Sequence, residues 1–410
     1  RQKYQLHVHY LLEHEFQPLV CNHKQSLVHL LYGRKGLQLS RIFAYDNYDI
    51  YVNGDYTPPL PTAKPTQLSM KDRKSGIKTL DVAFGNNQFV TVGCAEDYCR
   101  EGDQGGVMVS ANGTQWRMIT VPFIGHAIVF HQDRFIVASA LGFYYSKDGL
   151  TWVKGNTYEE NNHDSVAHIQ ELEYLGGQFV AVGRHGLVMT SDNGDDWTVR
   201  HLDDNNQPTF DHLSFINGRY VTVGLGNGAH SKALVSDDGI NWSIQATQQV
   251  SEDASEGINL NNVYAIGELF YGYSSMGFHS SPDGVIWSAP TKLSLIDEDD
   301  ELITNLSNIG YAGGAYIHYV NDLFVTYSNY EFNGRGYFTT SVDGIHWQRR
   351  DSNFGDAWKG NHSAEFSFFN QFHVTFGNDT FVIVSDESGD SVQSNNGGLS
   401  WQRKQTRGGK

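Results

Sequence analysis

Short apolar runs rich in β-branched and aromatic residues recur along most of this chain. One kind begins with Phe or Tyr, continues with alternating Val-rich positions and ends in Gly or Ser. A second run, ending in an aromatic residue, precedes each copy across a short turn. Runs of this length bounded by glycine-rich turns predict β-strands rather than helices. The first kind occupies residues 89–93, 179–183, 220–224, 324–328 and 381–385, with weaker versions at Phe135 and Phe270.

A motif of Ser or Thr, then Asp or Asn, Gly and finally Trp follows each pair of strands. Seven copies use seven of the 8 tryptophans, and their spacing is close to the ~40–50 residues of a four-stranded propeller blade. An Asp-Gly or Asn-Gly pair between apolar runs predicts a tight turn, because the acid or amide caps amides and Gly tolerates positive φ. The copies are residues 110–116, 146–152, 190–197, 236–242, 281–287, 341–347 and 394–401.

The seven motifs resemble those of the Asp-box propellers, also called the bacterial neuraminidase repeat family. The resemblance covers residues 78–405 and implies an all-β fold, a seven-bladed β-propeller of four-stranded antiparallel blades. In that family the box is structural and marks the turn between the third and fourth strands. The sialidase branch has six blades and an Arg-Ile-Pro segment, which this chain lacks, so the resemblance argues against sialidase activity. The expected blades are about 78–120, 125–157, 167–201, 210–246, 258–290, 308–350 and 364–405.

Residues 1–65 carry no copy of the repeat and form a predicted N-terminal β-rich extension and linker. Residues 4–10 and 36–43 have strand-like patterns, and the proline-rich residues 56–65 predict an extended connector. The last box and its Trp strand lie at the C-terminal end of the repeat, so the final blade needs no strand from elsewhere. We therefore expect the ring to close by packing of blade faces.

Composition agrees with many short strands and excludes some partners. The chain has 43 Gly, 13% aromatic and only 18% charged residues, and its formal net charge is −17. Scattered Lys and Arg on such an acidic chain would repel a phosphate backbone, so nucleic acid is not an expected partner. No apolar run reaches the ~18 residues of a membrane helix, so we expect no membrane insertion.

Three cysteines bear on the compartment. Cys94 and Cys99 lie five residues apart beside a glycine-flanked loop, close enough to form a disulfide, whereas Cys21 has no evident partner. A disulfide would fit a secreted protein, extracellular or periplasmic. Free thiols in a cytosolic protein are the alternative.

Candidate catalytic groups come from the first strand of each blade, which lines the central channel. Aligning these strands brings Asp81, Glu171, His212 and His373 into one column with Ala127, Asn261 and Tyr316, while His126 and His318 lie one position away. Carboxylates and imidazoles at the channel mouth could act as general acids and bases. A channel that holds water would also tolerate them without any function.

Candidate substrate-binding residues lie on loops of the face opposite the boxes. Trp358 is the only Trp outside a box and could stack on a sugar ring, and Tyr330 lies on another long loop. Arg184 and Arg335 could hold a sugar carboxylate with two hydrogen bonds. Each could instead serve only its own loop. Binding residues concentrate on variable loops over a rigid scaffold, so this face is the predicted site.

No cofactor is assigned from the sequence. The histidines show no metal-binding spacing such as HExxH. The acidic run at 297–301 lacks the alternating ligands and Gly of an EF-type loop, so calcium stays an open alternative there and a solvated loop is preferred.

Three classes of function remain open. The first is a glycan-active enzyme, a glycoside hydrolase or polysaccharide lyase acting on acidic glycans. The second is a non-catalytic glycan-binding propeller, and the third is a protein-assembly scaffold. A scaffold should show an arginine-rich patch, and a repeated lectin should show the same residues in each blade. The loops here differ between blades, which favours one unique glycan or polysaccharide site.

Overall fold

The computed structural model describes residues 19–20, 27–33, 36–42, 77–94, 99, 104–140, 142–155, 169–202, 209–225, 230–249, 258–274, 276–296, 302–303, 317–328, 337–352, 372–385 and 391–404. The chain divides into two compact units, Arg1–Lys64 and Pro65–Lys410. In the first, β1 (Leu19–Val20), β2 (Leu27–Gly33) and β3 (Gly36–Ile42) form an antiparallel sheet in that order. Strand β3 corresponds to the run expected at 36–43. The run at 4–10, the connector at 56–65 and Cys21 lie outside the described residues.

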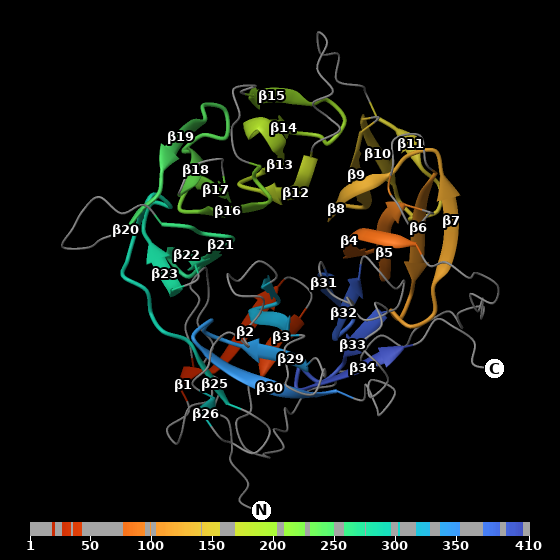
Figure 1. The fold of residues 1–410 in the computed structure, drawn as a ribbon. Coiled ribbons are helices and arrows are strands. Elements are labelled where there is room, and N and C mark those ends of the chain that lie inside the picture. The colour runs from red at the N-terminus through yellow and green to blue at the C-terminus, as the bar shows by residue number, and fades with distance from the viewer. Residues whose placement is uncertain are drawn as a thin grey trace, which may run out of the picture. The chain divides into compact units, whose positions relative to one another are not determined.

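The second unit is a ring of seven four-stranded blades, so the predicted all-β, seven-bladed propeller is confirmed (Figure 1). Blades 1 and 2 are β4 (Lys78–Gly85), β5 (Gln88–Cys94), β6 (Gly105–Ser110), β7 (Arg117–Val121), and β8 (Gly125–His131), β9 (Arg134–Ser139), β10 (Gly142–Ser146), β11 (Val153–Lys154). Blades 3 and 4 are β12 (Ile169–Leu175), β13 (Gln178–Gly183), β14 (Val188–Ser191), β15 (Thr198–His201), and β16 (His212–Ile216), β17 (Arg219–Leu225), β18 (Ser231–Ser236), β19 (Ser243–Ala246).

The remaining three blades complete the ring. They are β21 (Val263–Ile266), β22 (Leu269–Ser274), β23 (Gly277–Ser281), β24 (Ile286–Trp287); β27 (His318–Val320), β28 (Leu323–Ser328), β29 (Tyr337–Ser341), β30 (His346–Ser352); and β31 (Phe372–Gly377), β32 (Thr380–Ser385), β33 (Ser391–Ser394), β34 (Ser400–Lys404). In blade 5 the fourth strand joins the third through the Ser288 N–H, which donates to the Ser280 carbonyl at 2.8 Å.

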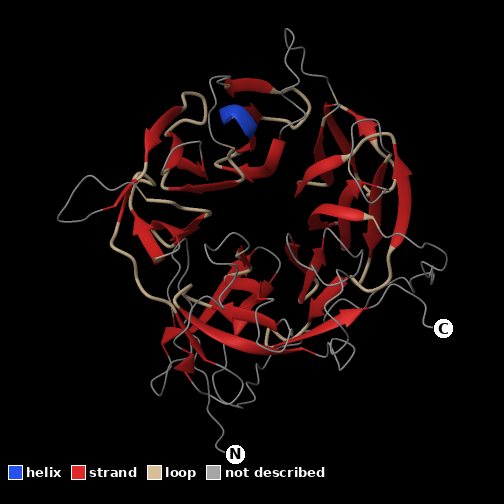
Figure 2. Ribbon diagram, viewed as in Figure 1, coloured by secondary structure: helices blue, strands red, loops and turns tan. Residues whose placement is uncertain are grey.

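Strands account for almost all the regular structure (Figure 2). Within the described residues the one helical segment is the 3₁₀ turn η2 (Arg184–Gly186). Over that same part of the chain, no helix has the length and apolar character needed to pass through a lipid bilayer.

The boxes form the turns between third and fourth strands by one shared hydrogen-bond pattern. In blade 5 the Ser281 hydroxyl donates to Asp283 Oδ1 at 3.0 Å, and the same oxygen accepts from the Val285 and Ile286 amides at 2.9 Å each. Trp287 then donates its indole N–H to the Gly284 carbonyl at 3.1 Å. The Asp therefore satisfies turn amides that would otherwise be unpaired, while the Trp anchors the turn on its blade.

The third box differs by one residue from its sequence alignment. The hydroxyl that bonds Asn193 at 3.1 Å belongs to Ser191, not to Thr190. Asn193 in turn accepts hydrogen bonds from the amides of Asp195 and Asp196, as the box residue does in the other turns. Thr190 belongs to β14 and its Oγ1 accepts instead from Arg200. The motif there therefore begins at Ser191.

Blade faces close the ring between the last blade and the first, as expected from the sequence. The Trp116 indole N–H of blade 1 donates to Ser391 Oγ of blade 7 at 3.2 Å, and Gln393 Nε2 donates to the Asn112 carbonyl at 2.7 Å. No strand is exchanged at this seam among the described residues. Each box thus serves its own blade and also contacts the preceding one, as Asn112 does here.

Connecting segments cover the outer edges of three blades. Strand β20 (Gln248–Gln249) pairs in parallel with β24, β25 (Ser294–Ile296) pairs in parallel with β30, and the end of β30 pairs in parallel with β34. A further short strand, β26 (Leu302–Ile303), pairs with β25. An added outer strand occupies edge groups that could otherwise pair with another chain.

Candidate functional site

Polar side chains of the first strands face the axis of the ring. Asp81 on β4, Glu171 on β12, His212 on β16 and His373 on β31 stand at the same register position, opposite Val92, Val182, Val223 and Val384 of their second strands. These first strands surround the centre of the ring (Figure 1). Each of the four side chains keeps between 22% and 29% of its surface accessible, so water reaches them. The aligned column is therefore real at these four positions.

The same groups influence one another across the ring. Burial is the main cause that raises the pKa of Glu171 in blade 3, and the charge of Asp81 in blade 1 adds to it. Burial is also the main cause that lowers the pKa of His318 in blade 6, and His212 in blade 4 adds to it. The ring centroids of His318 and of His373 in blade 7 lie 6.1 Å apart, so groups of these two blades share one space.

Two carboxylate–imidazole pairs bridge blades within this cluster. His212 Nδ1 lies 3.8 Å from Glu171 Oε2, and His373 Nδ1 lies 3.5 Å from Asp81 Oδ1. The first pair joins blades 3 and 4, and the second closes the seam between blades 7 and 1. The four catalytic candidates thus form two pairs, each of one carboxyl group and one imidazole.

The carboxylates also hold neighbouring blades together. Glu171 Oε2 accepts the Leu213 N–H of the next blade at 3.1 Å, and Asp81 Oδ2 accepts the Ile128 N–H of the next blade at 2.8 Å. Asp81 Oδ1 accepts the Val82 N–H at 2.7 Å. Both oxygens of Asp81 and Oε2 of Glu171 therefore have a structural role, in addition to any catalytic one.

Burial shifts these groups towards their uncharged forms. Desolvation raises the pKa of Asp81 to about 7, although hydrogen bonds from Ile128 and Val82 oppose it. Burial also raises the pKa of Glu171 well above its ordinary value, helped by the charges of Glu173, Asp211 and Asp81. Desolvation lowers the pKa of His212 to about 4 and that of His373 to about 3. Near pH 7 the cluster contains neutral imidazoles beside carboxyl groups that keep a large share of their protons.

Other positions of the predicted column behave differently. Ala127 is buried and His126 stands at the β8 register shift, outside the regular pairing. In blade 5 the buried polar group is Asn262 rather than Asn261, and its Nδ2 donates to the Ile317 carbonyl at 3.0 Å. The sequence alignment was one residue off because it took Tyr264 as the aromatic end of this strand, whereas Ala265 lies opposite Phe270. Tyr316 lies outside the described residues.

Two acids extend the cluster beyond the predicted residues, and His318, predicted to lie one position from the column, also belongs to it. Glu173 stands two residues after Glu171 on the same face of β12, and burial raises its pKa to about 7. His318 begins β27, with its ring centroid 6.1 Å from that of His373, and its Nε2 is buried without a hydrogen-bond partner. Asp211 precedes His212. Strand alternation alone would have marked Glu173, since residues i and i+2 share a face.

The predicted substrate-binding residues are only partly placed. Arg184 begins η2, the turn between β13 and β14, which lies at the strand ends opposite the box turns. His201 Nδ1 lies 2.6 Å from the Gly186 carbonyl and ties this turn to β15. Tyr330, Arg335 and Trp358 lie outside the described residues, as does the acidic run at 297–301. No group of His, Cys, Asp or Glu that could hold a metal ion occurs in the described part of the chain.

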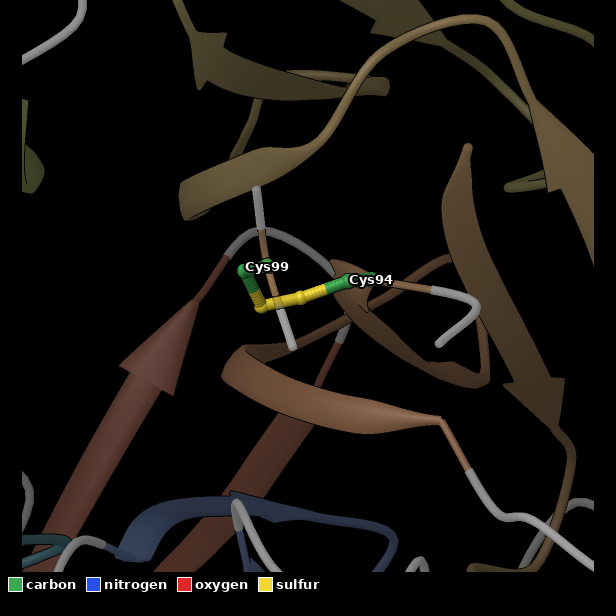
Figure 3. Close-up of a disulfide and its surroundings, with 2 residues drawn as sticks. All are labelled: Cys94 and Cys99. Carbon is green, nitrogen blue, oxygen red and sulfur yellow. A yellow bond between two sulfur atoms is a disulfide. The ribbon is translucent and has the colours of Figure 1, made fainter. Parts of the chain in front are cut away.

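A disulfide joins Cys94, at the end of β5, to Cys99 in the following loop (Figure 3). The Cα atoms are 5.4 Å apart, within the usual range for a disulfide. The predicted pairing is confirmed. It secures a loop between second and third strands, at the same strand ends as η2.

The comparisons with known proteins identify the fold. No protein-family model and no curated protein matches the chain. Among solved structures, PorZ of the type-IX secretion system of Porphyromonas gingivalis is 13% identical over 88% of this chain and 49% of that chain, with a TM-score of 0.50. YCF48 bound to D1 peptide is 15% identical over 78% and 93%, with a TM-score of 0.49, and an ancestral GH74 enzyme is 13% identical over 67% and 37%, with a TM-score of 0.38. At 13% identity, the likeness to PorZ supports the propeller fold and nothing about a ligand.

Proposed function

We propose that this chain is a secreted Asp-box propeller that binds a carbohydrate at the channel mouth, on the face opposite the boxes, and acts on it by general acid–base catalysis. The observation that carries the proposal is the pairing of Glu171 with His212 and of Asp81 with His373 around one axis. The seven box turns support the family assignment through their common hydrogen bonds. The Cys94–Cys99 disulfide supports an oxidising compartment.

The protonation states of the pairs fit acid–base chemistry. A carboxyl group with a raised pKa can give a proton near pH 7, and a neutral imidazole can accept one, although the lowered pKa values of His212 and His373 make these two imidazoles weaker bases than an exposed histidine. Glu171 and Asp81 are thus the proposed acids, and His212 and His373 the proposed bases. Both kinds of group also form hydrogen bonds with sugar hydroxyls, as donors and as acceptors.

The charges around the axis favour a neutral glycan over an acidic one. A uronate entering the ring would meet Asp81, Glu171 and Glu173, and its negative charge would resist their ionisation. Arg184, one of the two cations proposed for a sugar carboxylate, belongs to the η2 turn rather than to a first strand. Trp358 and Tyr330, predicted from the sequence on loops of this face, would supply stacking surfaces for a neutral ring.

Binding and product analysis with oligosaccharides tests the proposal. We expect neutral hexasaccharides to bind more tightly than oligogalacturonides, and Glu171→Gln to reduce turnover by about 10²–10⁴-fold while the protein stays folded. The matched control is Glu268→Gln, on the turn between β21 and β22 at the box side of blade 5. Equal turnover by wild type and Glu171→Gln would overturn the catalytic assignment.

A non-catalytic binding propeller is the second candidate, favoured by a specific contact. Asp81 and Glu171 both accept amide hydrogens from the next blade, which is a structural use of a carboxylate. In that case a glycan would bind and no product would form. Two results together would establish this candidate. The wild-type protein binds the oligosaccharide without changing its mass, and Glu171→Gln loses that binding.

A further inference from the structure

A serine–histidine pair lies in blade 5, on the second and third strands rather than on the first strands of the axial cluster. Ser274 ends β22, and its Oγ lies 2.7 Å from Nε2 of His279 on β23. The other ring nitrogen, Nδ1, lies 2.8 Å from the Ser288 carbonyl, just after β24. Three segments of one blade therefore meet at this imidazole.

The hydrogen bonds fix the tautomer of His279. A carbonyl oxygen only accepts, so Nδ1 must carry the proton that it donates to Ser288. Nε2 of the neutral ring is then an acceptor, and the Ser274 hydroxyl donates to it. Burial lowers the pKa of His279, which keeps the ring neutral near pH 7. A serine hydroxyl held against the free lone pair of an oriented imidazole is the arrangement of an activated nucleophile and its base.

The backbone adds a donor to the same oxygen. The Met276 N–H donates to Ser274 Oγ at 3.1 Å and fixes the position of this oxygen beside the imidazole. The pair is largely covered, with Ser274 7% and His279 1% exposed, but it lies directly beneath a surface turn, since Met276 is 53% exposed. Because so little of the pair is exposed, we expect only a small reagent to react with the oxygen.

We propose that Ser274 and His279, with the Ser288 carbonyl as the orienting group, form a second reactive site that takes small acyl or phosphonyl esters. In the acyl reaction Ser274 Oγ forms a bond to the carbonyl carbon while its proton passes to His279 Nε2. The alcohol then leaves with that proton as its C–O bond breaks. Water, deprotonated by the same nitrogen, hydrolyses the acyl-serine and restores both side chains.

A fluorophosphonate probe on the intact wild-type protein tests the site. The probe should form an Oγ–P bond at Ser274 and release fluoride, and peptide mass spectrometry should map the adduct to that residue. Ser274→Ala should abolish the adduct, and His279→Gln should slow labelling by about 10²–10⁴-fold, as loss of a general base does. Ser243→Ala, which removes an exposed serine of β19, is the matched control and should label like wild type.

The pH dependence of the labelling rate in the wild-type protein tests the site without any variant, so it applies even if a variant fails to fold. Base catalysis by His279 predicts a labelling rate that rises to a plateau below pH 6.5, because burial lowers its pKa. An adduct at Ser274 with this plateau supports the proposal. No adduct at Ser274, undiminished labelling in folded His279→Gln, or a rate that keeps rising tenfold per pH unit above pH 8 would show that the pair only fastens its turn.

Discussion

At the scale of single residues, a box glycine permits a positive φ and also leaves room for the preceding blade. The sequence motif alone does not distinguish these two roles. Gly284 has φ +74°, a conformation that side chains with a Cβ rarely adopt, and a Cβ there would lie 2.5 Å from Val221 of the preceding blade. Gly267, in the turn between β21 and β22, has φ +61° and nothing within 4 Å of its would-be Cβ. The first glycine is needed for packing as well as for its backbone.

This difference leads to a paired stability experiment. Gly267→Ala should cost about 1–2 kcal/mol from the left-handed backbone alone. Gly284→Ala should cost about 1–3 kcal/mol more, because the added methyl overpacks the interface with blade 4. Chemical denaturation of both variants measures the difference. Equal losses would mean that the box glycine does not contribute to contact between blades.

At the scale of elements, the repeat was predictable and the connections between blades were not. The hydrogen bonds that form each box turn join residues only a few positions apart, so each box is visible as a motif in the sequence. Strand β25 has three residues and is a strand through its pairing with β30 and β26, which no local pattern encodes. Asn262 replaced Asn261 because Ala265, not the aromatic Tyr264, lies opposite Phe270, and strand pairing rather than residue type decides that position. The axial pairs required the closed ring, which no local spacing encodes.

Strand β25 offers a direct check of its role in packing. Leu295 is fully buried in a cluster with Trp347 and Phe324, whereas Ile296 beside it is 36% exposed. We expect Leu295→Ala to lower the free energy of unfolding by about 2–5 kcal/mol and Ile296→Ala to change it by less than about 0.5 kcal/mol. Thermal or urea unfolding decides the matter, and similar losses in both variants would argue against an inward-facing β25.

At the scale of the whole molecule, the axial cluster shapes the dependence of stability on pH. Carboxyls with raised pKa values stabilise the fold at low pH, and this contribution is lost as pH rises towards 7. Histidines with lowered pKa values stabilise the fold above pH 6.5, and this contribution is lost as pH falls. Between about pH 4.5 and 6.5 the two trends oppose each other, so they should largely cancel. Stability should then fall above pH 6.5.

Asp81→Asn isolates one part of this balance. The amide keeps an oxygen for the Ile128 N–H but cannot ionise. The stability of wild type relative to Asp81→Asn should therefore decrease from pH 4 to pH 7, by at most about 4 kcal/mol, since a shift of one pKa unit is worth 1.36 kcal/mol. The side chain is 25% accessible, which reduces the effect. A difference that does not vary with pH would contradict the raised pKa of Asp81.

The most direct test of the account is a histidine titration by NMR with and without sugar. Protein labelled at histidine ¹³Cε1 is titrated from pH 8 to pH 4, with assignments from His212→Asn and His373→Asn, and then mixed with a neutral hexasaccharide. Both resonances should stay at their neutral positions down to about pH 5, because burial lowers the pKa of His212 to about 4 and that of His373 to about 3. Both should also shift when the sugar binds. Titration near pH 6.5, or resonances that do not respond to a sugar that binds, would contradict the axial carbohydrate site.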